Sequence, residues 1–236
     1  MQEIITQKQF LDLYKGGQRL FSNCLMQFFD IADATFENIV FRNCKLLLCT
    51  FRNCSFKTCT FEQCTVYSGS FYNGRADDLI FDMCNIEMTL FDNYQFFKSA
   101  MKRSNLRWFG MINSPGIDIS SSTQFKIITD LSQVSEAEIE ELSRMLMGTV
   151  ERMDLGARLK VKDLIRESID RYNLAQPEEK KDKYASQADY SDAPLTYGEA
   201  KGAVEAFFYG MNTDPYKSKK PYETAGGYKK NNEPNK

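Results

Sequence analysis

The segment Phe41–Thr65, FRNCKLLLCTFRNCSFKTCTFEQCT, decides the fold because one pattern returns in it every five residues. Its five cysteines stand five apart, and Cys24 and Cys84 continue the same register, so all seven cysteines of the chain share it. An α-helix places apolar residues every three to four positions and a β-strand every two, so a period of five fits neither. The period instead predicts a chain that turns a corner every five residues.

A second apolar row lies two residues after each cysteine position. Its members are Phe36, Phe41, Leu46, Phe51, Phe56, Phe61, Val66, Phe71, Ala76, Phe81, Ile86, Phe91, Phe96, Met101 and Leu106, of which Ala76 is the weak one. We expect the large residue to point to the axis of a coil, the small one to pack beside it, and the other three positions to face water. Four such faces make a square coil whose backbone groups pair with the next coil.

The run from Phe41-Arg-Asn-Cys-Lys to Phe61-Glu-Gln-Cys-Thr resembles the pentapeptide-repeat family. The resemblance covers residues 19–113 and implies a right-handed quadrilateral β-helix. At about 20 residues per coil this span would hold four to five coils, which is a rod roughly 20–25 Å long at the usual spacing of strands.

Departures from the pattern mark places where we expect the coil to be irregular. Gly69 and Gly74 replace the small side chain, and Ala76-Asp-Asp-Leu79 reads as a repeat with one extra residue. A bulge or short loop around residues 73–80 would absorb that insertion. The bulky Tyr94 stands where a small residue belongs, which indicates a distorted face or the widening end of the coil.

The sequence on both sides of the repeats predicts helices that begin with capping boxes. These patterns are Thr6-Gln-Lys-Gln9, Ser135-Glu-Ala-Glu138 and Thr196-Tyr-Gly-Glu199, and Phe125–Thr129 reads as a strand or a final cover. The predicted segments are an N-terminal capping helix in 1–18, the β-helix in 19–113, a helical region in 114–175, a linker in 176–195, a helix in 196–211 and a basic, aromatic tail in 212–236 that we expect to be disordered.

The sequence offers no recognisable catalytic or cofactor motif. It has no histidine, which removes imidazole bases and histidine metal ligands, and it has neither a phosphate-binding loop nor a dinucleotide fingerprint. The cysteines are five apart rather than in the closer pairs of zinc sites, so we interpret them as buried, reduced thiols that fill the core. The acids Asp77, Asp78 and Asp82 are interpreted as a solvated corner. We therefore predict no enzyme activity, no metal and no cofactor.

The composition limits the classes of partner that we expect. The formal charge is −2, with 30 basic and 32 acidic residues, which predicts no preference for nucleic acid or for an acidic membrane. No apolar run approaches the length of a membrane helix, and the start lacks the pattern of a secretory signal. We therefore expect a cytoplasmic protein, or one within an assembled particle.

The leading hypothesis is a non-catalytic interaction or scaffold protein that docks into a larger assembly, as repeat proteins of bacterial or phage origin do; a homo-oligomer stays open. The residues expected to touch the partner are Arg42, Arg52, Lys57 and Arg75 on the coil, and Phe207, Phe208, Tyr216, Lys219, Lys220, Tyr222 and Tyr228 beyond it.

The alternative hypothesis comes from the resemblance. Some pentapeptide-repeat proteins resemble a DNA duplex, bind type II topoisomerases such as gyrase, and protect them from toxins. Such mimicry needs a strongly negative face. Residues 1–113 carry 12 basic and 11 acidic residues, and this near balance favours the interaction protein over the mimic.

Overall fold

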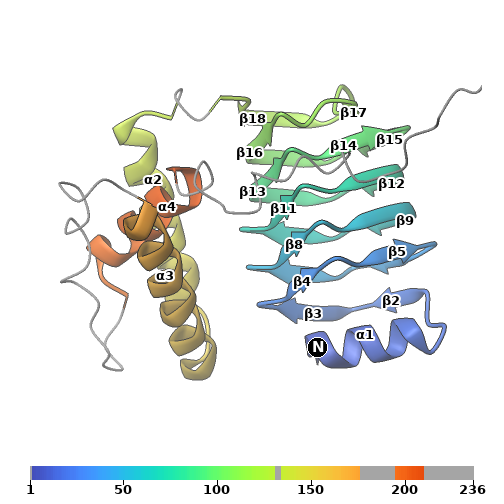
Figure 1. Cartoon of the computed structure of the whole chain (residues 1–236), viewed down its shortest axis with the longest axis horizontal. Helices are drawn as coiled ribbons and strands as arrows, with labels where there is room; N and C mark the ends of the chain where they lie inside the picture. The colour runs from blue at the N-terminus through green and yellow to red at the C-terminus, as the bar shows by residue number, and fades with distance from the viewer. Residues whose placement is uncertain (1, 131–133, 176–194, 210–236) are drawn as a thin grey trace, which may run out of the picture.

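The computed structural model describes residues 2–130, 134–175 and 195–209, with side chains given through residue 165 and for 195–205. The described part is a parallel β-solenoid with one short helix at its N-terminal end and three helices along one side (Figure 1). Every strand pair is parallel, and paired residues in successive coils are 20 apart through most of the stack, as in Lys45–Thr65–Asn85.

Two sheets form the walls of the solenoid. The helix-side sheet contains β1 (Glu3–Ile5), β3 (Cys24–Gln27), β4 (Asp30–Ala32), β7 (Lys45–Leu47), β8 (Thr50–Arg52), β10 (Thr65–Tyr67), β11 (Ser70–Tyr72), β13 (Asn85–Asp92), β16 (Asn105–Ile112) and β18 (Thr123–Ile128). The open sheet contains β2 (Leu20–Ser22), β5 (Thr35–Glu37), β6 (Val40–Arg42), β9 (Ser55–Glu62), β12 (Arg75–Asp82), β14 (Gln95–Phe97), β15 (Ser99–Lys102) and β17 (Ile117–Asp118).

A left-handed residue makes each corner of the coil. From Asn23 to Asn113 every fifth residue has a positive φ, between 47° and 60°. The N–H of a corner residue donates to a carbonyl of the next coil, as Asn43 does to Glu62 at 2.9 Å. Nine of these 19 residues are Asn or Asp, the side chains that tolerate this region best, which explains the asparagines of the repeat.

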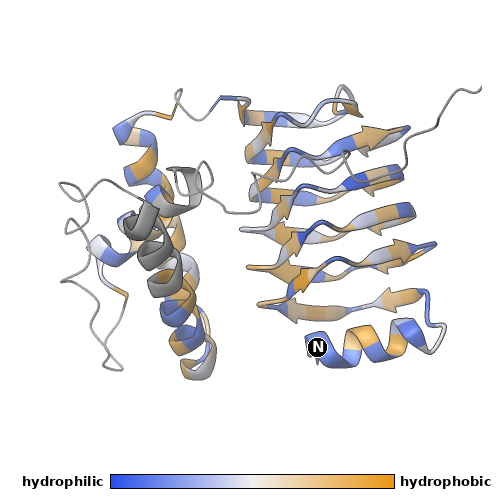
Figure 2. Cartoon of the chain, viewed as in Figure 1, coloured by the Kyte–Doolittle hydropathy of each residue, from blue (hydrophilic) through white to orange (hydrophobic). Residues whose placement is uncertain are grey.

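The core is a set of aromatic columns along the solenoid axis. Phe41, Phe61 and Phe81 stack at centroid distances of 4.6 and 4.7 Å, and Phe71 and Phe91 stack at 4.4 Å. The hydrophobic stretches therefore recur at the same place in successive coils (Figure 2). All seven cysteines are buried and free, which confirms that they pack in the core.

The helix α1 (Gln7–Lys15) closes the N-terminal end of the solenoid. Its capping box is confirmed, since the Thr6 side chain accepts from the Gln9 N–H and the Gln9 side chain accepts from the Thr6 N–H. The ring of Phe10 lies 4.9 Å from that of Phe21 and 5.6 Å from that of Phe36, measured between centroids. The first coil is therefore covered by an aromatic side chain rather than by water.

The predicted irregularity around residues 73–80 is wrong. The strand β12 runs through Arg75–Asp82 and keeps one register with β9, from Arg75 opposite Ser55 to Asp82 opposite Glu62. Ala76 takes the core position and Leu79 the small-residue position of the next repeat, and both are buried. No residue is inserted, so no bulge is needed.

Tyr94 neither distorts a face nor widens the coil. Its side chain is fully buried because its ring occupies the space that Gly74, one coil earlier, leaves free. Its hydroxyl donates to the carbonyl of Cys54 at 3.0 Å, two coils away. The glycine and the tyrosine therefore compensate each other within one column.

The solenoid extends beyond residue 113. Asn105–Gly110 of β16 pairs with Thr123–Ile128 of β18, so the segment that read as a strand or cover is a strand of the same sheet. On the N-terminal side β1 pairs with β3. The predicted four to five coils referred to the repeats alone, and the stack is longer because these strands add to both ends.

Three helices lie beside the helix-side sheet, namely α2 (Glu136–Glu151), α3 (Leu155–Ala175) and α4 (Tyr197–Tyr209) (Figure 1). The capping boxes at Ser135 and Thr196 are both confirmed. The helices pack on each other through Leu142, Val161 and Val204, all of them buried. None of the helices that the structure describes is long and apolar enough to cross a membrane.

Candidate functional site

The candidate site lies where the helices meet the solenoid. Five corner residues of the helix-side sheet form one column along the axis, here called the helix-side corner, and they are Phe28, Leu48, Ser68, Met88 and Trp108. Four of the five are apolar, although a large side chain at a left-handed residue costs about 1–2 kcal/mol. Those four pack in one hydrophobic cluster with Leu142, Leu146 and Val150 of α2, and this burial offsets the backbone cost.

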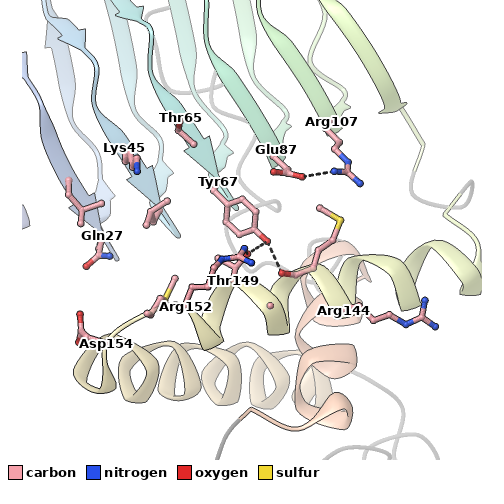
Figure 3. Close-up of a pocket in the computed structure, with 15 residues that line it drawn as sticks. Gln27, Lys45, Thr65, Tyr67, Glu87, Arg107, Arg144, Thr149, Arg152 and Asp154 are labelled. Carbon is pink, nitrogen blue, oxygen red and sulfur yellow. Dashed lines mark hydrogen bonds and ion pairs between the residues drawn. The ribbon is translucent and has the colours of Figure 1, made fainter. Parts of the chain in front are cut away.

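A groove of about 830 Å³ runs between the helix-side sheet and α2 (Figure 3). The solenoid contributes outward side chains of successive coils, α2 contributes four residues between Arg144 and Thr149, and Arg152, Met153 and Asp154 follow the helix. The lining is Leu25, Gln27, Lys45, Leu47, Thr65, Tyr67, Glu87 and Arg107 on one wall and Arg144, Met145, Gly148, Thr149, Arg152, Met153 and Asp154 on the other. Apolar side chains are thus present on both walls, together with four basic and two acidic ones.

Tyr67 ties the two walls together. Its hydroxyl donates to the carbonyl of Met145 at 3.4 Å and accepts from the Thr149 hydroxyl at 3.0 Å (Figure 3). Burial raises the pKa of Tyr67 above its ordinary value, so the hydroxyl keeps its proton for the bond to Met145. These two bonds fix the position of α2 on the sheet at the middle of the groove.

A second tie lies at one end of the groove. The guanidinium of Arg107 lies 3.5 Å from the carboxylate of Glu87 on the next coil and 3.3 Å from that of Glu141 on α2. Beside it, Lys126 of β18 forms an ion pair with Glu138 of α2. The charges at this end are therefore matched between the solenoid and the helix.

Two cations of the groove have no acidic partner among the residues that the structure describes. Lys45 on β7 is exposed and makes no hydrogen bond or ion pair there. Arg152 follows α2, and its guanidinium donates only to the Thr149 hydroxyl, at 3.3 Å. The two acids of the lining are engaged elsewhere, since Glu87 faces Arg107 and the Asp154 carboxylate accepts from the Ala157 N–H at 2.9 Å.

The four coil residues expected to bind a partner do not form one patch. Arg42, Lys57 and Arg75 lie on the open sheet, whereas Arg52 lies on β8 of the helix-side sheet. Each one faces an acid: Arg42 lies 2.7 Å from Glu62, Arg52 2.7 Å from Asp30, Lys57 2.8 Å from Glu37, and Arg75 3.8 Å from Asp77. These pairs join neighbouring coils in three of the four cases and leave little unmatched positive charge.

The expected partner residues of the last third can be placed only in part. Phe207 and Phe208 lie within α4, where the backbone alone is described. Tyr216, Lys219, Lys220, Tyr222 and Tyr228 lie outside the described residues. The predicted linker 176–195, except its last residue, also lies outside them.

The acid cluster and the thiols show structural roles. Asp82 pairs with Arg103 on the next coil, Asp77 with Arg75, and Asp78 is an exposed corner residue. Burial raises the pKa of Cys49 to about 12 and that of Cys54 to about 11, so both thiols stay protonated. Within the described ranges no three Cys, Asp or Glu residues gather where they could hold a metal ion.

The repeat unit is five residues long, each unit ends in a left-handed corner, and in-register parallel strands stack every 20 residues. The fold is a pentapeptide-repeat β-solenoid.

No family model matches the chain, and no curated protein matches it. Among solved structures, it is similar to a pentapeptide repeat protein (Rfr23) from the cyanobacterium Cyanothece 51142, with 11% identity, a TM-score of 0.28, and coverage of 51% of this chain and 95% of that one. It is also similar to two trypsin-treated variants of QnrB1, a plasmid-mediated fluoroquinolone resistance protein. Identities are 17% and 16%, both TM-scores are 0.25, and the alignments cover 52% of this chain and 77% and 85% of those.

The groove of the pentapeptide-repeat solenoid was not predicted from the sequence, although a signal for it exists. The outward positions were expected to be polar, yet Leu47, Leu48, Tyr67, Met88 and Trp108 are apolar and all belong to the helix-side sheet. Large apolar residues at positions that require a left-handed backbone, repeated at intervals of 20, mark the side of a solenoid that something else covers.

Proposed function

We propose that this solenoid is a non-catalytic interaction protein that docks into a larger assembly through the outer face of its open sheet. The observation that supports this most directly is that, of the helices in the described parts of the chain, α2, α3 and α4 lie on the helix-side sheet and α1 lies at the end of the stack (Figure 1). The outer face of the open sheet is thus left uncovered by them.

The open sheet presents an aliphatic column with polar surroundings. Leu20, Val40, Thr60 and Ile80 stand one residue before the core position in successive coils and point outward, with Leu20 exposed and the other three half-buried, whereas Ala100 in the same column is buried. Leu20 is 50% exposed, and Met83 and Phe97 on neighbouring columns are 44% and 43% exposed. An apolar column with polar neighbours is typical of a protein-binding surface.

The charges around this column favour a protein partner over nucleic acid. Arg42 pairs with Glu62, Lys57 with Glu37, and Arg103 with Asp82, so basic and acidic side chains alternate along the face. A nucleic-acid site needs uncompensated positive charge, and a DNA mimic needs uncompensated negative charge. The same alternation counts against the topoisomerase-binding alternative, because a DNA mimic needs a face on which negative charge is not compensated.

Within this proposal Arg42, Lys57 and Arg75 form part of the polar rim. Arg75 also lies over the exposed ring of Phe97, with its guanidinium carbon 4.5 Å from the ring centroid. Residues 196–236 remain a proposed second attachment, and the protein is proposed to act in the cytoplasm or within an assembled particle.

The proposal is tested by capture of partners from the protein's own source. The tagged full-length chain is compared with the double variant Val40→Lys/Ile80→Lys, and recovered proteins are quantified by mass spectrometry. The matched control is Ile4→Lys/Leu13→Lys, which replaces two exposed apolar residues at the N-terminal end of the stack. Circular dichroism melting verifies that both variants are folded.

We expect a partner whose recovery falls at least tenfold with Val40→Lys/Ile80→Lys and stays unchanged with the control. Equal recovery by all three proteins would contradict the placement on the open sheet. Recovery of type II topoisomerase subunits would instead support the DNA-mimic alternative. The same capture with a chain that ends at Tyr209, and so keeps α4, measures how much residues 210–236 contribute to partner recovery.

A further inference from the structure

The groove beside α2 holds more positive charge than its own acids compensate. Lys45 projects from the solenoid wall and Arg152 from the helix wall, and neither has an acidic partner in the described parts of the chain (Figure 3). The two acids of the lining are already engaged by Arg107 and by the Ala157 N–H. A ligand that enters the groove therefore meets a net cationic lining.

The groove is long as well as cationic. Its solenoid wall runs from the coil of Leu25 to the coil of Arg107, four coil spacings that span about 19 Å at the usual strand separation. Its helix wall runs from Arg144 to the end of α2 at Glu151, about 10 Å at the rise of an α-helix, and continues through Arg152, Met153 and Asp154. Five or six residues of an extended chain have this length.

The groove has both polar and apolar lining. Arg107 and Arg144 lie at one end and Lys45 and Arg152 toward the other (Figure 3), and Leu25, Leu47, Met145 and Met153 add apolar surface to the lining. Arg107 is already paired with Glu87 and Glu141, and Arg144 with Glu140, so the cations of the lining left for a ligand are Lys45 and Arg152. A chain with carboxylates and apolar side chains matches these two cations and the apolar surface, and methionine adapts to varied partners.

Gly148 keeps the groove open. It lies inside α2 and lines the groove, and a Cβ added there would meet one atom within 4 Å, the guanidinium of Arg152 at 3.8 Å. Packing therefore does not require glycine, although glycine costs a helix interior about 1 kcal/mol relative to alanine. A site that needs close approach to the helix backbone explains its presence.

We propose that this groove binds an extended acidic peptide segment of a partner protein, with Lys45 and Arg152 pairing with its carboxylates and the leucine and methionine side chains holding its apolar residues. This site lies on the helix-side sheet, whereas the proposed partner face lies on the open sheet, and the site does not depend on that face. The acidic peptide is anchored by charge, so its affinity falls as salt rises.

The test is a yeast-displayed library of random nonapeptides sorted against the full chain. We expect enriched peptides to carry at least two Asp or Glu residues next to Leu, Ile or Met. Their affinity, measured by fluorescence anisotropy on the labelled peptides, falls at least tenfold with Lys45→Glu/Arg152→Gln. The matched control is Lys102→Glu/Lys98→Gln, which makes the same charge change on exposed lysines of the open-sheet side and leaves the affinity unchanged.

A second variant tests the groove itself. Gly148→Phe places a ring in the groove, so it abolishes binding while the melting temperature stays the same or rises. Inorganic phosphate at 10 mM does not compete with the peptide. The proposal is overturned if no acidic peptide is enriched, or if the affinity of the enriched peptides is the same for both groove variants as for the unchanged chain. It is also overturned if phosphate displaces the peptides, which would indicate a site for a compact anion. Val40→Lys/Ile80→Lys leaves peptide binding intact, so failure of the open-sheet proposal and failure of this one are distinguishable.

Discussion

Corner residues set the local energetics of the solenoid. Asn and Asp suit the left-handed backbone, whereas other side chains adopt it at a cost. Met83 is an apolar corner residue that faces solvent, with 44% of its side chain exposed, so nothing offsets its cost. Trp108 is a corner residue too, but it is buried beneath the helices.

The two corners predict opposite effects of one substitution. Met83→Asn is expected to raise the free energy of unfolding by roughly 0.5–1 kcal/mol, because Asn relieves the backbone. Trp108→Asn is expected to lower it by about 3 kcal/mol or more, because the helices lose their aromatic contact. Urea unfolding followed by circular dichroism measures both, and a stabilising Trp108→Asn would refute the role given to the helix-side corner.

Gly74 and Tyr94 predict a second contrast. A methyl group at residue 74 would overlap the Tyr94 ring and the Cys54 carbonyl, so Gly74→Ala is expected to cost about 2–3 kcal/mol. Gly148→Ala, made in open space on α2, is expected to stabilise by up to about 1 kcal/mol. Thermal melting of the two variants compares them, and similar melting temperatures would mean that the column is not tightly packed.

The buried thiols predict a loss of stability at high pH. Burial raises the pKa of Cys24 and of Cys54 from 9.0 to about 11 and that of Cys49 to about 12. The unfolded chain releases these protons first, so stability is complete below pH 9 and falls as pH rises toward 11–12. Each thiol contributes about 1 kcal/mol of this loss by pH 10.

Urea unfolding at pH 8 and pH 10 measures that loss. Cys49→Ser/Cys54→Ser should reduce it by about 2 kcal/mol, because serine does not ionise. Serine suits this position, since Ser104 stands in an equivalent place and donates to the Lys102 carbonyl at 2.9 Å. An unchanged pH dependence in this variant would show that other groups cause it.

At the scale of elements, α1 acts as the cover of the first coil. Phe10 is buried against four aromatic rings of the first coils, so Phe10→Ala is expected to cost about 3–5 kcal/mol. Thr6→Ala removes one half of the capping box and should cost about 1 kcal/mol. Leu13→Ala, on the exposed side of the same helix, should cost less than about 0.5 kcal/mol by the same thermal melts. Equal losses of stability in Phe10→Ala and Leu13→Ala would contradict the role of α1 as the cover of the first coil.

The elements also show what could be predicted from the sequence. The period of five predicted the solenoid because each unit of five residues makes the same turn, and that turn buries the Phe at the core position and the Cys beside it. The capping boxes of α1, α2 and α4 were predictable for the same reason, since Thr6, Ser135 and Thr196 bond within four residues.

Features that depend on contacts between coils could not be predicted in this way. The compensation of Gly74 by Tyr94 joins residues 20 apart, and the sequence alone suggested a bulge there. The docking of α2 joins Tyr67 to Thr149, which are 82 residues apart. The groove follows from that docking, so neither its walls nor the unmatched Lys45 and Arg152 were visible as a site.

The whole molecule is asymmetric in what its sides expose. The helix-side sheet is covered by helices and keeps a groove with two cations that are unpaired within the described residues, whereas the open sheet offers a mainly aliphatic column edged by paired charges. A rigid stack with two such different sides suits a scaffold that holds two partners at a fixed separation. We propose that the open sheet is the partner-binding side.

The most direct test of that claim is site-specific photo-crosslinking in the protein's own source. Benzoylphenylalanine is placed at Ile80 on the open sheet and, as a control, at Leu13 on α1, and the crosslinked products are identified by mass spectrometry. The account predicts a defined product of one partner protein from position 80 and none from position 13. Absence of a product from position 80, or the same product from both positions, would contradict it.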